Sequence, residues 1–238
     1  MPYVVGTETE FGLTAGSCGG ALQPSSQELA DAVVKAVVER RSYLPAPRTH
    51  RHLFLGNGAA IYPDVGGHPE AATAECDDPR ELATQELALR GMLVEATRAA
   101  AETYGIPLQL LANNLDYAPE PHSFGHHINL LASRRLKAPQ IESQLTPLLV
   151  ALTVLAGTGR VSGEGFELSQ RAGFMCRIAG RTTTARGLIT TKDESLAGAT
   201  WQRVHLISID TPLSPSAMML VPAILAMALE LLDRGKGM

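Results

Sequence analysis

The sequence has few cysteines and no excess of positive charge, and each absence excludes a class of protein. Its three cysteines, Cys18, Cys76 and Cys176, are widely spaced and include no Cys-x-x-Cys pair. This pattern argues against a disulfide framework and against a zinc site, so we expect reduced thiols, with a packing role for Cys76. The formal net charge of −4 provides no basic field that would attract nucleic acid.

The sequence also lacks a long uninterrupted hydrophobic run. Its longest apolar stretch, Ala217 to Leu229, is interrupted by Pro222 and is too short to span a bilayer. The chain opens directly on a strand-like segment, without the charged and apolar regions of a secretory signal. Hydrophobic residues make up 45% and charged residues 18% of the 238, the composition of an ordinary globular protein. We therefore expect a cytoplasmic enzyme or binding protein, with residues 1–238 forming a single catalytic-type domain.

The segment from residue 4 to residue 12 predicts a strand with two carboxylates on one face. Side chains alternate along a strand, so Glu8 and Glu10 share a face. Like charges this close repel unless a cation lies between them, and such oxygen ligands suit Mg²⁺. The alternative is a solvent-facing strand with two ordinary glutamates. The opposite face would carry the side chains of Val5, Thr7, Thr9 and Phe11.

The rest of the chain alternates between strand and helix patterns. Gly56-Asn57-Gly58 predicts a hairpin turn, and Asp78 followed by Pro79 predicts the start of a long helix that ends before Gly105. A further strand places His127 and Asn129 on one face, and His126 and Ile128 on the other. The expected helices cover residues 26–41, 79–104, 141–156 and 214–232, and the expected strands cover 4–12, 52–55, 59–62, 71–76, 108–112, 123–131 and 202–208.

Acidic residues gather in the first third of the chain and cations in the second half. Brought together across one sheet, they would hold Mg²⁺ and the phosphates of a nucleotide, as phosphoryl transfer requires. Asp64, beside two flexible glycines, could then act on a substrate; alternatively, each of these residues is a solvated surface group. The carboxylates are Glu8, Glu10, Asp64, Glu70 and Glu75, and the cations are Arg160, Arg171, Arg186, Lys192, Arg203 and His205.

Several motifs, spread over nearly the whole chain, resemble the Pup ligase and depupylase family. That family is similar in fold to glutamine synthetase and other carboxylate-amine ligases. The motifs occur in the family's order, and the Tyr62 to Cys76 block is the most specific. They are residues 5–12, 54–59, 62–76 (YPDVGGHPEAATAEC), 113–116, 123–125 with His127 and Asn129, 168–171, and 191–194 with residues 203–205.

The resemblance implies an α+β fold in which an antiparallel sheet forms a concave cradle for ATP and Mg²⁺, with helices on its outer face. In the ligase, ATP phosphorylates a glutamate side chain of Pup and a lysine attacks the acyl phosphate; in the depupylase, the same site hydrolyses an amide. The expected partner is a Pup-like protein or a peptide ending in glutamate or glutamine. The resemblance implies Asp64 as the catalytic carboxylate with Tyr62 beside it, Glu8, Glu10, Glu70 and Glu75 as metal ligands, and His127, Asn129, Arg171, Lys192, Arg203 and His205 as cofactor contacts.

The chain departs from the family pattern at a few positions. Ile128 stands where the family has glutamate, Lys192 where it has arginine, and Ser195 and Leu196 where it has proline and histidine. A short link between the first strand and the hairpin favours the ligase, because depupylases carry a longer insertion there. Two alternatives stay open: an amide hydrolase or ATP phosphatase that uses Asp64, and a nucleotide-binding protein without turnover, suggested by Ile128.

The final helix pattern is apolar nearly all round, which predicts burial on both sides. Members of the family continue beyond this helix, whereas this sequence ends at Met238. We therefore expect a homo-oligomer in which a second subunit covers the helix.

Overall fold

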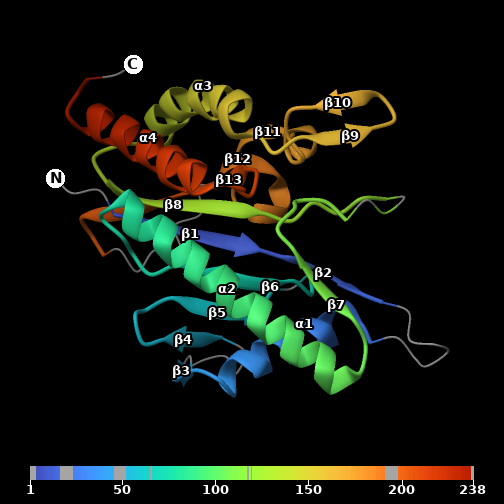
Figure 1. Ribbon diagram of the computed structural model, residues 1–238. Coiled ribbons are helices and arrows are strands. Elements are labelled where there is room, and N and C mark those ends of the chain that lie inside the picture. Colours follow the sequence, from blue (N-terminus) through green and yellow to red (C-terminus); the bar gives the residue numbers. More distant parts are fainter. Residues whose placement is uncertain are drawn as a thin grey trace.

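A computed structural model describes residues 4–16, 24–45, 52–64, 66–116, 118, 120–190 and 198–236. Cys18, Lys192, Ser195 and Leu196 lie outside these ranges. Nine strands form one sheet in the order β11-β12-β13-β8-β1-β6-β5-β4-β3, in which β11 and β12 are parallel and the other neighbours are antiparallel (Figure 1). Their bounds are β1 Val5–Glu10, β3 Tyr43–Pro45, β4 Leu53–Leu55, β5 Ala60–Pro63, β6 Pro69–Ala72, β8 His126–Ser133, β11 Arg177–Gly180, β12 Gly187–Thr190 and β13 Trp201–Ile209.

The α-helices of the described residues cover one face of this sheet (Figure 1). The core has two clusters, and each joins helix residues to residues from the same face of the strands. One centres on Ile128, Leu145 and Leu225, the other on Ile61 and Leu93. The helices are α1 Ser26–Val38, α2 Pro79–Tyr104, α3 Ala138–Ala156 and α4 Pro215–Asp233, and two small sheets pair β2 Gly12–Ala15 with β7 Leu108–Leu111 and β9 Arg160–Ser162 with β10 Gly165–Glu167.

The alternation predicted for the first strand is confirmed. Val5, Thr7 and Thr9 of β1 are buried toward the helices, so Glu8 and Glu10 lie on the open face of the sheet. The same holds for β8, whose His126 contacts Thr9 on the helix side. The open face therefore carries the carboxylates, and the opposite face carries the core.

The hairpin and the long helix also form where the sequence predicts them. Gly58 adopts a φ of 92°, which the turn between β4 and β5 requires. Asp78 caps α2 by accepting a hydrogen bond from the backbone N–H of Arg80, and Gly105 ends the helix at a φ of 65°. Helix α1 is capped by Ser25 through a capping box with Glu28, and it ends at Val38, before the predicted end at residue 41.

The strand predicted over residues 71–76 is wrong beyond Ala72, where β6 ends. The next residues bond elsewhere: the hydroxyl of Thr73 accepts from the backbone N–H of Thr7, and the backbone N–H of Ala74 donates to the side chain of Gln85. Glu75 is consequently exposed and stands apart from the other carboxylates.

Helix α4 is the one described helix that is long and apolar enough to cross a membrane by length and composition. It packs against α2, α3 and β8, as the core helix of a globular domain does. Its outer face leaves Leu220 and Met227 53% and 57% exposed in the single chain, so the predicted burial on both sides would require a second subunit. The homo-oligomer stays a prediction.

Candidate active site

Three neighbouring strands bring Glu10, Glu70 and Tyr62 side by side on the open face. Glu10 of β1 pairs with Glu70 of β6, which pairs in turn with Tyr62 of β5. The hydroxyl of Tyr62 donates a 2.8 Å hydrogen bond to Oε1 of Glu70, and its ring stacks on His52 with centroids 4.3 Å apart. Tyr62 is therefore held in place from two sides.

Glu10, Asp64 and Glu70 form an acidic cluster whose carboxylate oxygens lie within 4.8 Å of one another. Burial raises the pKa of Glu70 well above its ordinary value, and repulsion from Glu8 and Glu10 adds to the increase. Burial together with the charge of Glu70 also raises the pKa of Tyr62. Repulsion of this kind is relieved when a divalent cation binds between the oxygens, so the donor set fits Mg²⁺.

The turn that carries Asp64 is fixed by its own hydrogen bonds. The backbone N–H of Asp64 donates to the carbonyl of His68, and one carboxylate oxygen of Asp64 accepts from the N–H of Gly66 at 3.2 Å. Gly67 adopts a φ of 76° and its Cα lies against the first turn of α1, so a side chain there would be strained and crowded. The glycines predicted to free the backbone thus form a tight turn that directs Asp64 toward the cluster.

A second cluster surrounds Glu8. One oxygen of Glu8 lies 3.3 Å from Nδ1 of His127 and 3.6 Å from Nε2 of His205. The other oxygen accepts from Nδ2 of Asn129 at 3.1 Å and from Nη2 of Arg203 at 3.2 Å. A carboxylate and two imidazoles within 4.8 Å can hold a divalent metal.

The surroundings of Glu8 favour its ionised form. Burial alone would raise the pKa of Glu8, but hydrogen bonds from His127 and His205, and the positive charge of these imidazoles when they are protonated, outweigh it and hold the pKa well below its usual range. Burial lowers the pKa of His205, which favours the neutral imidazole that binds metals.

Arg171 is a buried cation that faces the acidic cluster. Its Nη2 donates to the carbonyl of Ile207 at 2.8 Å, while its buried Nε has no hydrogen-bond partner within the described part of the chain. Burial lowers the pKa of Arg171, and the charges of Glu10 and Asp210 partly offset this. A buried N–H donor without a partner is uncommon in folded proteins, and the guanidinium that carries it lines the cavity described below.

The site closes around Gly125, where the chain enters β8. A Cβ on this residue would lie 2.5 Å from Nε2 of His127 and 2.8 Å from Nη1 of Arg171, so a larger residue would displace both side chains. The backbone N–H of Gly125 donates to Glu10. Arg171, His127 and Glu10 therefore meet at one glycine.

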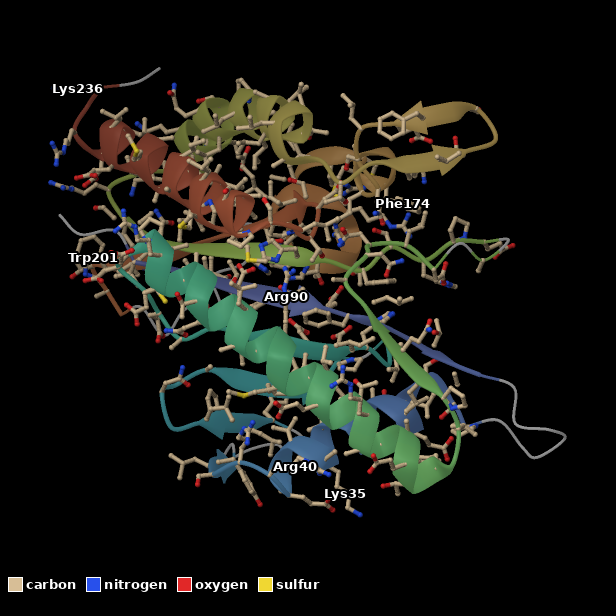
Figure 2. All side chains as sticks on the ribbon, viewed as in Figure 1. Lys35, Arg40, Arg90, Phe174, Trp201 and Lys236 are labelled. Atoms are coloured by element: carbon tan, nitrogen blue, oxygen red, sulfur yellow. The ribbon has the colours of Figure 1, made fainter. Side chains whose placement is uncertain are left out.

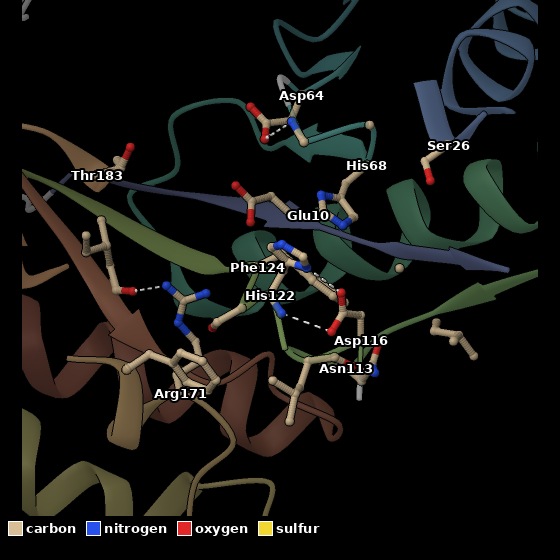
Figure 3. Close-up of a pocket in the computed structure, with 18 of the residues that line it drawn as sticks. Glu10, Ser26, Asp64, His68, Asn113, Asp116, His122, Phe124, Arg171 and Thr183 are labelled. Atoms are coloured by element: carbon tan, nitrogen blue, oxygen red, sulfur yellow. Dashed lines mark hydrogen bonds and ion pairs between the residues drawn. The ribbon is translucent and has the colours of Figure 1, made fainter. Parts of the chain in front are cut away.

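These groups line a cavity of about 820 Å³, which is large enough for a nucleotide. Figure 3 shows Asp64, Glu10 and the guanidinium of Arg171 pointing into the same space. Phe124 forms part of the wall and stacks on His68, with ring centroids 4.5 Å apart. Sequence reasoning assigned no role to this stacked pair, although both residues lie within the motifs that resemble the family.

The structure places most of the predicted site residues in the lining of this cavity, in the acidic cluster or in the cluster around Glu8. Glu75 is the exception, because β6 ends before it, and Lys192 lies outside the described residues. Ile128 is fully buried on the helix side. A glutamate at that position would face the core, so its absence removes no ligand from the open face. The residues that come together are Glu8, Glu10, Tyr62, Asp64, Glu70, His127, Asn129, Arg171, Arg203 and His205.

A sheet that carries carboxylates and imidazoles on its open face, with helices behind it, is a glutamine synthetase-like fold. A solved structure described as a novel glutamine synthase homolog matches it with a TM-score of 0.50 at 14% identity, over 99% of this chain and 56% of that one. Residues 3–238 match the family model described as Pup-ligase protein. The chain belongs to the Pup ligase family.

Individual relatives agree with this assignment. The Pup--protein ligase of Bifidobacterium longum is 35% identical over 217 residues, 87% of this chain and 42% of that protein. The one from Nakamurella multipartita is 36% identical over 245 residues, 98% of this chain and 52% of that protein. The crystal structure of the complex between Pup and its ligase PafA matches with a TM-score of 0.82 at 26% identity, over 100% of this chain and 47% of that one. The chain thus spans about half the length of the curated relatives it matches.

A second PafA structure, in complex with ADP, shares the fold. It has a TM-score of 0.64 at 24% identity and covers 94% of this chain and 49% of its own. The likeness in fold therefore extends to a structure that was solved with a nucleotide.

Proposed function

We propose that this chain binds ATP with Mg²⁺ in its cradle and activates the side-chain carboxylate of a glutamate for isopeptide bond formation, as a carboxylate-amine ligase of the Pup ligase type. The observation that carries the proposal is the acidic cluster of Glu10, Asp64 and Glu70, whose Glu10 and Asp64 line the same cavity as the guanidinium of Arg171 (Figure 3). Metal ligands and a phosphate-binding cation are thereby combined in one space.

The two clusters divide the binding work. Glu10 and Glu70 would hold one metal ion, and Glu8 with His127 and His205 would hold a second. Bound Mg²⁺ would neutralise the phosphate oxygens and the charge that develops during phosphoryl transfer. Arg171, whose guanidinium lines the cavity, would bind a phosphate, and Arg203, held by Asn129 and Glu8, would supply positive charge at the second cluster.

We assign the step on the second substrate to Asp64. The γ-phosphoryl group of ATP passes to the glutamate carboxylate, giving an acyl phosphate and ADP. A lysine amine then attacks the acyl carbon, phosphate leaves, and an amide forms. The attacking ammonium group must first lose a proton, and we assign its removal to the carboxylate of Asp64, which belongs to the acidic cluster and lines the cavity.

Support for the substrate comes from the relatives. The solved complex contains Pup with its ligase PafA, and we infer a Pup-like protein or a peptide that ends in glutamate as the partner of this chain. The reaction requires ATP, so we expect it to take place in the cytoplasm.

The experiment incubates the full chain with ATP, Mg²⁺, a peptide ending in glutamate and an amine acceptor, and it follows ADP and peptide mass. We expect ADP formation coupled to amide formation, with both lost in Asp64→Asn and retained in the matched control Asp77→Asn, whose exposed carboxylate lies outside the cavity. ADP formation that is equal in both variants would contradict the role of Asp64. Deamidation of a glutamine-ended peptide without amide formation would assign the hydrolase instead.

A nucleotide-binding protein without turnover receives less support than the ligase. This alternative was suggested by Ile128, which stands where the family has glutamate. Because Ile128 faces the core, the substitution removes no side chain from the open face of the sheet. Tight nucleotide binding without any product in this assay would nevertheless favour it.

A further inference from the structure

Asp210 follows β13 and is a buried carboxylate, 4% exposed, that accepts five hydrogen bonds. Its Oδ1 accepts from the hydroxyl of Ser169 at 2.7 Å and from the backbone N–H of Arg171 at 3.1 Å. Its Oδ2 accepts from the backbone N–H of Thr158 at 2.9 Å, from the Thr158 hydroxyl at 3.2 Å, and from the backbone N–H of Gln170 at 3.1 Å. Five donors can stabilise a buried carboxylate without a cationic partner.

Three of these donors belong to residues 169–171, a segment that is neither helix nor strand. The hydroxyl of Ser169 also accepts from the backbone N–H groups of Arg171 and Ala172, at 3.1 and 3.0 Å. Irregular backbone has no ladder of its own, so Asp210 supplies the bonds that fix its path. The side chain of Arg171 leaves from this segment and reaches the cavity (Figure 3).

The same segment is attached to the opposite wall through Asn114. The side-chain oxygen of Gln170 accepts from the backbone N–H of Asn114 at 2.8 Å. The side-chain amide of Asn114 donates to the carbonyl of Phe124 at 3.0 Å and to the hydroxyl of Thr211 at 2.8 Å. Phe124 precedes Gly125, whose N–H binds Glu10. One connected set of buried hydrogen bonds therefore fixes Arg171 relative to Glu10.

We propose that Asp210 is a positioning residue that sets the orientation of the Arg171 guanidinium toward an anionic ligand in the cavity. That the anion is a nucleotide phosphate rests on the proposed function. Asp210 does not touch the ligand: it fixes the backbone, the carbonyl of Ile207 fixes Nη2, and the guanidinium is held facing the cavity (Figure 3). Buried, fully satisfied networks of this kind make a side chain rigid before its ligand arrives.

The test replaces Asp210 with Asn, which keeps the size of the side chain. Whichever way the amide is turned, its NH₂ group faces at least two donors, so those hydrogen bonds are lost. We expect ADP with Mg²⁺ to bind about tenfold more weakly, measured by titration calorimetry. Asp233→Asn is the matched control, since Asp233 lies at the end of α4 and pairs with Arg135 outside the cavity.

A double-mutant cycle separates positioning from general loss of structure. If Asp210 acts through Arg171, the double variant Asp210→Asn with Arg171→Ala binds ADP no more weakly than Arg171→Ala alone. Additive losses would overturn the proposal. Should Asp210→Asn fail to fold, Ser169→Ala makes the same test, because it removes one donor to Asp210 and leaves the carboxylate charged.

A ligand-free measurement keeps this proposal separate from the proposed function. The Nε–H resonance of Arg171, assigned by its loss in Arg171→Lys, is expected to be restrained in the natural chain and averaged in Asp210→Asn. An unchanged resonance would overturn the positioning role even if ADP binds. If the resonance averages as expected but the natural chain binds no nucleotide, the positioning role holds and the proposed function fails.

Discussion

The hydroxyl of Thr7 donates a 2.8 Å hydrogen bond to Oε1 of Glu86, behind the strand that carries Glu8. Glu86 is buried in α2, and Arg90, one turn further along (Figure 2), lies 3.5 Å from its other oxygen. Burial raises the pKa of Glu86 to about 7, although Thr7 and Arg90 favour the charged form. A carboxyl that titrates near neutral pH thus supports the strand that carries Glu8 and Glu10.

Glu86 makes stability depend on pH. Between about pH 4.5 and 7, Glu86 keeps its proton in the folded chain but has lost it in the unfolded chain. The stability that this proton contributes is therefore complete below about pH 4.5 and is lost as the pH rises through about 7. The difference between the folded and unfolded pKa of Glu86 corresponds to about 3 kcal/mol in the free energy of unfolding. Glu86→Gln keeps the acceptor for Thr7 and cannot titrate. We expect urea unfolding at pH 5 and pH 8 to show a fall in stability that is about 3 kcal/mol smaller in the variant. Equal falls in both proteins would contradict the prediction.

Gly125→Ala tests whether the site depends on close approach at one glycine. The new Cβ would push both His127 and Arg171 from their places, so we expect the affinity for ADP with Mg²⁺ to fall at least about tenfold. Gly91→Ala is the matched control: nothing lies within 4 Å of its Cβ, and alanine in the interior of α2 should stabilise the fold by about 1 kcal/mol. Calorimetric titration of both variants checks this, and unaltered binding by Gly125→Ala would show that the close approach is not needed.

Tyr62→Phe removes the hydroxyl that supports Glu70 and leaves the stacked ring in place. Partners that hydrogen-bond to a metal ligand orient it, and their loss commonly weakens metal binding by about tenfold or more. We expect Mg²⁺ affinity, measured as the metal-dependent shift in melting temperature, to fall by about that factor. Tyr104→Phe, at the exposed end of α2, serves as the control. If Mg²⁺ shifts the melting temperature of Tyr62→Phe as much as that of the natural chain, the Tyr62 hydroxyl does not support metal binding.

The parts of this site that the sequence predicts are those governed by local rules. Strand alternation is enough to place Glu8 beside Glu10 and to separate His127 from His126. Glu75 does not join the other carboxylates, because β6 ends where Thr73 bonds to β1 and Ala74 bonds to α2. No local sequence pattern encodes these two bonds. Arg171 was predicted as a cofactor contact from the resemblance, but its position depends on Asp210, 39 residues further along the chain. A contact between residues so far apart in the sequence forms only in the assembled fold, so local sequence patterns do not predict it.

The two clusters should differ in the metals they prefer, because only the one around Glu8 contains imidazoles. Nitrogen ligands favour Co²⁺ over Mg²⁺, whereas carboxylates suit Mg²⁺. Replacing His205 with Gln exchanges an imidazole for an amide, so we expect Co²⁺ affinity to fall about tenfold more than Mg²⁺ affinity. Glu70→Gln in the all-carboxylate cluster should weaken both metals to a similar extent. Competition titrations of each variant with the two ions distinguish the clusters. A parallel loss of both metals in His205→Gln would contradict the predicted preference, and unchanged affinity for both would show that His205 does not bind the ion.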